Sequence, residues 1–232
     1  MKPTLLFIHG LGSRGGVFDL LRAQPFFSQY EGHAPDLPGY GPQSGELVEN
    51  AFETALGYLE NYVKDIEGPL AIIGHSMGGA LGLLLNERLG DKAVAFISFE
   101  GTMISEDYGP VTKQLTMQHT EEEIDAMRFH LIAFARGMTP GWQEWADDIA
   151  KLNALTFRNY ARDLATQADT GRLPELFNAL PCPKLYIHGD RYENRSILKL
   201  LPEKDVRHVP DAGHFLLQDQ PAQCAAFIEQ VL

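Results

Sequence analysis

The sequence predicts an α/β fold, in which a mostly parallel sheet carries helices on both faces. Short apolar runs bounded by Gly, Pro or Asp alternate with segments of helical spacing. Strand followed by helix, repeated, is typical of a parallel sheet, because parallel neighbours need a long crossover connection. The runs predicted as strands are 4–9, 70–74, 94–99, 184–188 and 206–209, and the flanking helical segments are 46–65, 77–89 and 220–231.

One block interrupts this alternation. Residues 103–180 contain no convincing strand, but they contain amphipathic patterns at 120–136 and at 142–155, the second continuing toward Leu164. Thr120 and Glu123 form a capping-box pattern that predicts the start of the first helix. We therefore expect a helical cap over 103–180, inserted between two strands of a core built from 1–102 and 181–232.

Composition narrows the class of protein. The chain has 232 residues, 44% hydrophobic and 22% charged, which is ordinary for a globular domain. A net charge of −12 with scattered Lys and Arg argues against a nucleic-acid partner or an anionic membrane surface. No apolar run approaches the roughly 20 residues that cross a bilayer, and no signal-like segment opens the sequence. Cys182 and Cys224 form neither a disulfide framework nor a zinc motif, so we expect a reduced, cytoplasmic setting and no membrane insertion.

The stretch "GHSMG", residues 74–78, contains the candidate nucleophile. A Gly-x-Ser-x-Gly pattern is weak evidence alone, but here it follows a buried apolar run and opens a helical segment. In that position the serine lies on a sharp strained turn, and the flanking glycines let strand and helix approach. Ser76 is therefore predicted to be a nucleophile.

A serine hydroxyl needs a neighbouring base to take its proton. Of the eight histidines, His214 in "VPDAGHFLLQDQP" follows the last predicted strand in a Gly-containing loop ahead of the final helix. Such a loop at the carboxyl edge of a parallel sheet can bring an imidazole to a serine on a neighbouring strand end. His214 is the predicted base.

The developing oxyanion needs two hydrogen-bond donors. One is the backbone N–H of Met77, directly after the nucleophile at a helix N-terminus. The second is expected from the loop after the first strand, "FIHGLGS", where His9-Gly10 turns the backbone so that the N–H of Leu11 points at the same spot.

Together these stretches resemble the α/β-hydrolase superfamily over essentially the whole chain. The matching segments are "LLFIHGLGS", "HAPDLPGYGPQSG", "AIIGHSMGGALG", "KLYIHGD" and "VPDAGHFLLQDQP". The resemblance implies Ser76 as nucleophile, His214 as base, and the backbones of Leu11 and Met77 as oxyanion donors. It also implies a helical cap where the strandless block lies, and a compact member with about six parallel strands.

The acid of the triad departs from the family pattern. In most members an Asp stands three residues after the glycine that ends the penultimate strand, but three residues after Gly189 this chain has Tyr192. Glu100 directly follows the strand 94–99, the alternative position from which some members present their acid. A carboxylate at the end of an apolar run is costly to bury without a partner such as His214. Glu100 is our first candidate, with Glu193 and then Asp190 as alternatives.

The predicted function is hydrolysis of a carboxylic ester or thioester with a small to medium acyl group, with no cofactor and no metal. Two alternatives remain open: C–C bond hydrolysis or elimination on the same residues, and a ligand-binding module with little turnover. Aromatic residues of the cap, Trp142 and Trp145 among them, are expected either to wall the substrate pocket or to pack the cap on itself. The substrate and the oligomeric state are not readable from the sequence.

Overall fold

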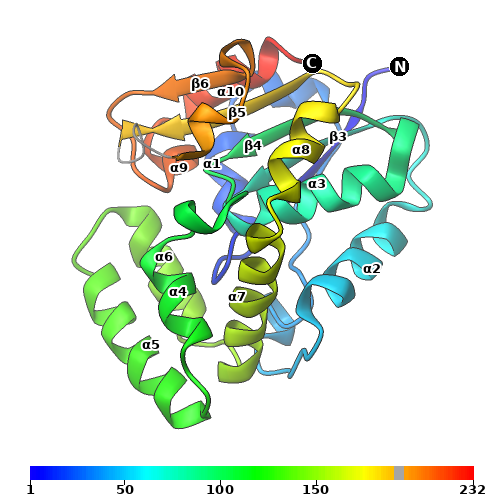
Figure 1. Ribbon diagram of the computed structural model, residues 1–232. Helices are drawn as coiled ribbons and strands as arrows, with labels where there is room; N and C mark the ends of the chain where they lie inside the picture. The colour runs from blue at the N-terminus through cyan, green and yellow to red at the C-terminus, as the bar shows by residue number, and fades with distance from the viewer. Residues whose placement is uncertain (191–195) are drawn as a thin grey trace.

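The computed structural model describes residues 1–190 and 196–232, and within them the sheet is entirely parallel. Its strands lie in the order β2-β1-β3-β4-β5-β6 (Figure 1). Their bounds are β1 Thr4–Ile8, β2 Gly32–His33, β3 Leu70–His75, β4 Ala93–Phe99, β5 Lys184–Gly189 and β6 Val206–Val209. The predicted α/β class and the strand count of about six are confirmed. The strand that sequence patterning missed is β2, whose two residues pair with Leu5 and Leu6 and are too few to show alternation.

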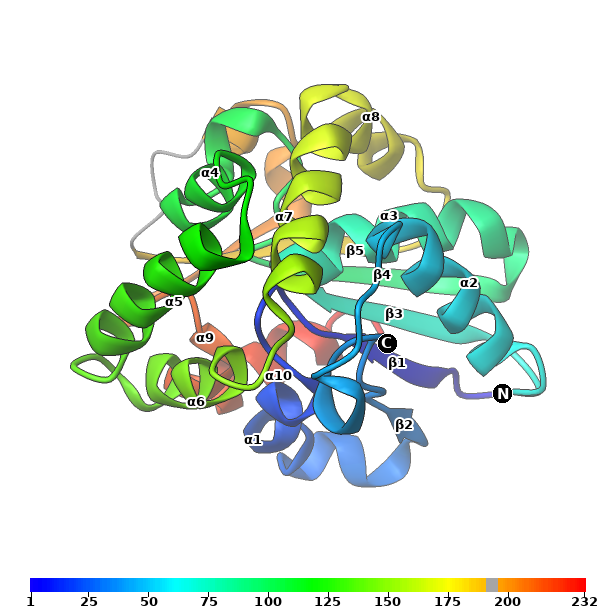
Figure 2. The ribbon, with the colours of Figure 1, turned by 90° about the horizontal axis from the view of Figure 1, so that it is seen from below.

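Helices cover both faces of this sheet (Figure 2). α2 and α3 lie on one face, and α1 and α10 lie on the other. The helices, in chain order, are α1 Asp19–Arg22, α2 Ala51–Val63, α3 Met77–Leu89, α4 Pro110–Thr116, α5 Glu121–Ala135, α6 Pro140–Ile149, α7 Ala154–Asp169, α8 Arg172–Ala179, α9 Leu216–Asp219 and α10 Pro221–Glu229. All five residues of β1 and all six of β3 are buried, as expected for strands covered on both sides.

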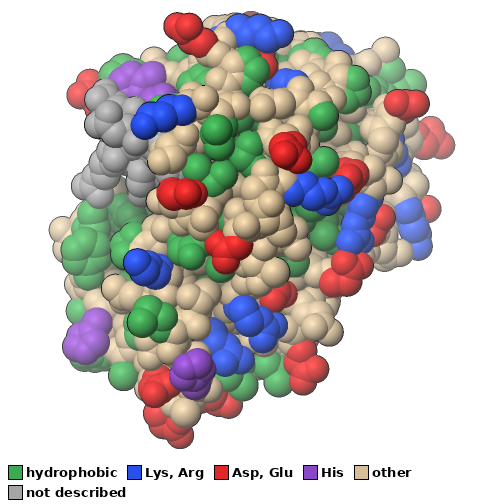
Figure 3. Space-filling model, viewed as in Figure 1, with side chains coloured by type: hydrophobic (Ala, Val, Ile, Leu, Met, Phe, Trp, Pro, Cys, Tyr) green, Lys and Arg blue, Asp and Glu red, His purple; other side chains and the backbone are tan. Residues whose placement is uncertain are grey.

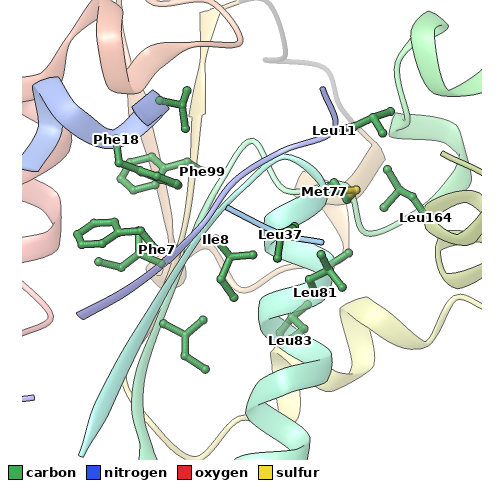
Figure 4. Close-up of a cluster of buried hydrophobic side chains, with 14 of the residues drawn as sticks. Phe7, Ile8, Leu11, Phe18, Leu37, Met77, Leu81, Leu83, Phe99 and Leu164 are labelled. Atoms are coloured by element: carbon green, nitrogen blue, oxygen red, sulfur yellow. The ribbon is translucent and has the colours of Figure 1, made fainter. Parts of the chain in front are cut away.

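The core lies on both sides of the central strands. Successive side chains of a strand point to opposite faces, so Phe7 packs with Phe18 on one side while Ile8 points toward Leu81 on the other (Figure 4). Each of these four side chains is at most 1% exposed. This rigid sheet fixes the strand ends from which the candidate site is built.

Helices α4 to α8 fill the segment between β4 and β5. The Thr120 and Glu123 capping box at the start of α5 is present: the Glu123 N–H donates to Thr120 Oγ1, and the Glu123 carboxylate accepts from the Thr120 N–H. The expectation of one pattern running from 142 toward Leu164 is wrong. The chain breaks between α6 and α7, where the Asn153 side chain accepts from the Thr156 N–H and caps the new helix.

The helices of the 103–180 block do not all stand apart from the core. α7 packs against α2 and α3 as well as α4, and α8 packs against α3. In Figure 2, α4, α5 and α6 gather at one end of the sheet, while α8 lies on the same face as α3. The boundaries 1–102, 103–180 and 181–232 stay a prediction.

Charged side chains of both signs are mixed on the surface. On the face shown in Figure 3, Lys and Arg lie beside Asp and Glu. Arg88, for example, pairs with Glu53 and Glu60. No helix among the described residues is long and apolar enough to cross a bilayer.

Candidate active site

Ser76 lies at the turn between β3 and α3 in a strained conformation. Its φ of 54° and ψ of −119° fall in a region that non-glycine residues rarely adopt. The turn is held in place because the Ser76 N–H donates to the Phe99 carbonyl at 2.9 Å and the Ser76 carbonyl accepts from the Gly79 N–H at 2.9 Å. A serine held this way at a strand-to-helix turn has the form of a nucleophile elbow.

The two glycines of the motif make that turn possible. A Cβ on Gly74 would lie 2.3 Å from the Gly78 carbonyl oxygen, and one on Gly78 would lie 2.0 Å from the Ile8 carbonyl oxygen. Both contacts are far shorter than any real Cβ contact. The start of α3 is therefore pressed against the ends of β1 and β3, which places Ser76 next to the loop that follows β1.

His214 is held at the site by its loop. The Gly213 N–H donates to Asp219 Oδ2 at 2.8 Å, and the His214 carbonyl oxygen lies 2.8 Å from Nε2 of His75. Since a carbonyl can only accept, His75 carries its proton on Nε2. The two imidazole rings lie 4.8 Å apart. His75, the residue directly before the nucleophile, therefore fixes the position of the predicted base.

Glu100 is fully buried and lies beside His214. Its Oε2 is 3.7 Å from Nδ1 of His214, and its Oε1 accepts from the Gly189 N–H at 2.7 Å. Its backbone also sits in the left-handed region, with φ of 52°, and its N–H donates to the Ile187 carbonyl. Gly189 is the glycine after which most family members place their acid; here its N–H holds Glu100 instead. Triad hydrogen bonds are often long before substrate is bound, so 3.7 Å is compatible with an acid that orients the imidazole.

Of the two alternative acids, the structure describes only Asp190, whose carboxylate contacts His208 and Asp211. Asp190 Oδ1 lies 2.7 Å from Nε2 of His208, and its Oδ2 accepts from the Asp211 N–H at 2.6 Å. The Asp190 N–H also donates to Ala212, so this residue ties the His214 loop to β5. Glu193 lies outside the described residues.

The loop after β1 carries the predicted oxyanion donor Leu11. Two of its other N–H groups are used inside the protein: Gly12 donates to the Tyr40 hydroxyl at 3.4 Å, and Ser13 donates to the Gly10 carbonyl at 3.2 Å. A Cβ on Gly10 would lie 3.0 Å from the Ser76 Cβ, so the loop runs directly past the nucleophile. The Met77 N–H lies at the first residue of α3, where helix N–H groups have no partner within the helix.

His9 braces this loop as a buried neutral imidazole. Its Nε2 accepts from the Leu37 N–H at 3.0 Å, so the proton lies on Nδ1, which is 3.0 Å from the Gly10 carbonyl. Burial lowers the pKa of His9 to about 4, while the Gly10 carbonyl and the charge of Asp36 oppose that change.

We expect His9 to make the protein acid-labile. The folded-state pKa lies below the ordinary 6.5, so the unfolded chain binds the extra proton and stability falls as the pH drops from 6.5 through about 4. The loss from this group is about 3 kcal/mol. Between pH 7 and pH 4, the free energy of unfolding measured with urea should fall in both proteins. The fall should be smaller in His9→Gln than in wild type by about 3 kcal/mol. An equal drop in both proteins would contradict a neutral buried His9.

Ser76 and His214 share one cavity of about 310 Å³ between the sheet and the cap helices. The core contributes Gly10, Leu11 and Phe215, and the cap covers them with apolar side chains of α4, α5 and α6. These side chains are Val111 of α4, Leu131 and Phe134 of α5, and Trp142 and Trp145 of α6, and Met138 joins them from the segment between α5 and α6. A larger hollow of about 570 Å³ lies over α2, α3 and α7, but its arginines already pair with Glu53, Glu60 and Glu87. The smaller cavity is the candidate site because the predicted nucleophile Ser76 and the predicted base His214 line it.

Sequence reasoning missed three features of this site. The sequence pattern gives His75 no role beyond its place in the turn, and it gives no signal for Tyr40. α4 was not expected, although Gly109-Pro110 is a helix-start signal, with proline at the first helical position. Among the described residues, no group of three or more His, Cys, Asp or Glu side chains is arranged to hold a metal ion.

A family model described as the alpha/beta hydrolase family matches residues 5–227. The chain belongs to the alpha/beta hydrolase family. Among curated relatives, this hydrolase is 24% identical over 246 residues to the 2-hydroxy-6-oxo-6-(2'-aminophenyl)hexa-2,4-dienoic acid hydrolase of Metapseudomonas resinovorans, covering 97% of this chain and 81% of that protein. It is 28% identical over 109 residues to the pyrethroid hydrolase of Sphingobium wenxiniae, covering 47% of this chain and only 39% of that protein.

Two solved structures show the same fold. An N-acyl homoserine lactonase complexed with N-butanoyl homoserine matches with a TM-score of 0.74 at 17% identity, covering 99% of this chain and 88% of the other. A thermophilic esterase from Thermogutta terrifontis matches with a TM-score of 0.71 at 19% identity, covering 99% and 89%. At such identities the likeness shows the fold alone, and the hydrolase's substrate must be argued from its site.

Proposed function

We propose that this hydrolase cleaves a carboxylic ester or thioester of a small to medium acyl group through an acyl-enzyme on Ser76. One observation carries the proposal. Ser76, on its strained turn, and His214, 3.7 Å from the buried carboxylate of Glu100, line the same cavity. A serine, a base and an orienting acid are the groups that nucleophilic acyl transfer requires.

In the proposed mechanism His214 takes the proton of Ser76, and the serine oxygen attacks the ester carbonyl. Glu100 holds His214 by its Nδ1 side and stabilises the imidazolium that forms. The N–H groups of Leu11 and Met77 donate to the oxyanion of the tetrahedral intermediate. His214 then gives its proton to the leaving alcohol or thiol. Water activated by His214 attacks the acyl-enzyme and releases the acid, so the serine is regenerated.

The mostly apolar lining supports an acyl group as the part of the substrate that enters the cavity. A cavity of about 310 Å³ is at the small end of ligand sites, which suits a short or medium chain. p-Nitrophenyl esters from acetate to laurate test this directly. We expect the highest kcat/KM for butyrate or hexanoate, and a value for laurate lower by about tenfold or more. Failure to hydrolyse any ester of the series, together with no labelling by a fluorophosphonate, would contradict the proposal and favour the binding-module reading.

A second candidate is hydrolysis of a C–C bond. The observation that favours it is the alignment of nearly the whole chain with the Metapseudomonas dienoic acid hydrolase. A 2-hydroxy-6-oxo-hexadienoate offered to the protein would lose its visible absorbance on cleavage. If kcat/KM for this dienoate is well above that for p-nitrophenyl butyrate, C–C hydrolysis replaces ester hydrolysis as the proposed function. If the dienoate is not cleaved, the ester proposal is retained.

A further inference from the structure

The peptide between Leu11 and Gly12 is held from both sides. The Leu11 carbonyl accepts a hydrogen bond from the Trp145 indole N–H at 2.9 Å. The N–H of the same peptide, belonging to Gly12, donates to the Tyr40 hydroxyl at 3.4 Å. Trp145 is 5% exposed and Tyr40 is 1% exposed, so neither contact competes with bulk water. A loop of sequence Gly-Leu-Gly is thereby fixed by two side chains that are far from it in sequence.

Gly12 is what lets the cap helix reach this loop. Its φ is +78°, and a Cβ on it would lie 2.4 Å from Trp145 Nε1 and 2.6 Å from the Cγ2 atom of Ile149. Any side chain at position 12 would therefore push α6 away. The absence of one allows the indole to lie directly on the backbone next to Leu11.

The same face of α6 makes a second contact with this loop. Asp148, three residues after Trp145 and so on the same side of the helix, accepts from Arg14 Nε at 2.9 Å. Glu144 lies 3.8 Å from the same arginine. The helix is thus attached to the loop at both Leu11 and Arg14.

α6 also contacts the loop of the base. The rings of Trp142 and His214 lie 6.1 Å apart, and Trp142 packs edge-on against Phe215 at 5.1 Å. Glu144 Oε2 accepts from Gln218 Nε2 at 2.7 Å. One helix of the cap therefore touches both the loop that offers the Leu11 N–H and the loop that carries His214.

From these contacts we propose that Trp145 is a positioning residue that sets the direction of the Leu11 N–H, with Tyr40 holding the same peptide from its other end. This inference rests on the proposed acyl transfer at Ser76. Oxyanion donors stabilise a transition state only when they are aimed in advance, since reorientation during the reaction costs free energy. The glycines on either side of Leu11 leave this backbone free to turn, and the indole removes that freedom. α6 is then a part of the catalytic geometry as well as a wall of the pocket.

The variant Trp145→Phe removes the N–H and keeps an aromatic ring in place. We expect kcat for p-nitrophenyl acetate and butyrate to fall by about 10- to 100-fold, since small displacements of catalytic groups have effects of that size. KM should change by less than about threefold. The rate of fluorophosphonate labelling should fall with kcat. Phe134→Leu, which changes a cavity aromatic residue on α5 and leaves α6 as it is, is the comparison: it should change KM, and more so for longer chains.

Tyr40→Phe provides a second test that leaves the cap intact. Its kcat should fall by about tenfold or less, and the double variant should lose less than the product of the two single losses, because both side chains hold one peptide. A Trp145→Phe protein with unchanged kcat and a KM that depends on chain length would overturn the inference and leave Trp145 as a wall residue. That result, obtained with normal labelling of wild type, would leave the proposed function intact. If the wild-type protein itself did not hydrolyse these esters, the proposed function would be contradicted instead.

Discussion

Replacing Ser76 by Ala should lower kcat for p-nitrophenyl butyrate by about 10⁶-fold, the loss measured when a serine nucleophile is removed from an established triad. The reason is that the hydroxyl on the strained turn is removed, so the imidazole of His214 would be left to activate water alone. The small residual rate would come from binding and the oxyanion donors. Initial rates at saturating ester, measured with enough protein to detect the residual turnover, provide the test.

Ser28→Ala is the matched control for this variant. Ser28 is an exposed serine whose hydroxyl donates to Pro25, and it lies outside the cavity. Its kcat should match that of wild type within a factor of about two, as expected for a surface substitution. If Ser76→Ala kept more than about one hundredth of the wild-type kcat, a value far above that of triad serine variants, Ser76 would not be the nucleophile.

Glu100→Gln should lower kcat by about 10⁴-fold, the loss seen when the acid of a triad becomes its amide. Gln retains the volume of the side chain and an oxygen for the Gly189 N–H, so the fold should be kept. What is lost is the negative charge 3.7 Å from Nδ1 of His214. Without it the imidazolium is less stable, and the amide can select the wrong tautomer of the base. Steady-state kcat, with thermal unfolding to verify the fold, provides the measurement.

The alternative acids give the comparison for this prediction. Glu193→Gln should retain most of the wild-type kcat. Asp190→Asn should have a smaller effect than Glu100→Gln, about tenfold, because it loosens the loop of His214 without removing the charge beside it. Near-normal turnover in Glu100→Gln together with a large loss in Glu193→Gln would make Glu193 the acid. Equal and modest losses in both would indicate a Ser76–His214 dyad.

The positions of the candidate site residues were predictable where their signals are local. Ser76 is marked by the glycines that its turn requires, and His214 by its loop after the last strand. Glu100 stood out because a carboxylate at the end of a buried strand needs a partner. In each case a few neighbouring residues determine the backbone and the position at the sheet edge.

Features that depend on distant partners were not predictable. Trp145 and Leu11 are 134 positions apart, and nothing in either neighbourhood shows that the indole donates to that carbonyl. β2 is too short for a pattern and forms because β1 offers an unpaired edge. The break before α7 lies inside a pattern whose apolar spacing continues through it, and the chain is held there by a distant contact: the Asn153 N–H donates to the Ser44 carbonyl at 2.6 Å. Each of these is decided by packing between elements, which a single sequence does not display.

The central claim, an acyl-enzyme on Ser76, is tested most directly by trapping that intermediate. p-Nitrophenyl trimethylacetate acylates serine nucleophiles, and the trimethylacetyl group is then hydrolysed from the serine slowly. If the reaction is stopped with acid during the first turnover, the protein should retain the acyl group. Intact-protein mass spectrometry should show one trimethylacetyl group per chain, and peptide mapping should place it on Ser76. If the acyl group were found on another residue, or if Ser76→Ala formed the same adduct, Ser76 would not be the residue that carries the acyl group.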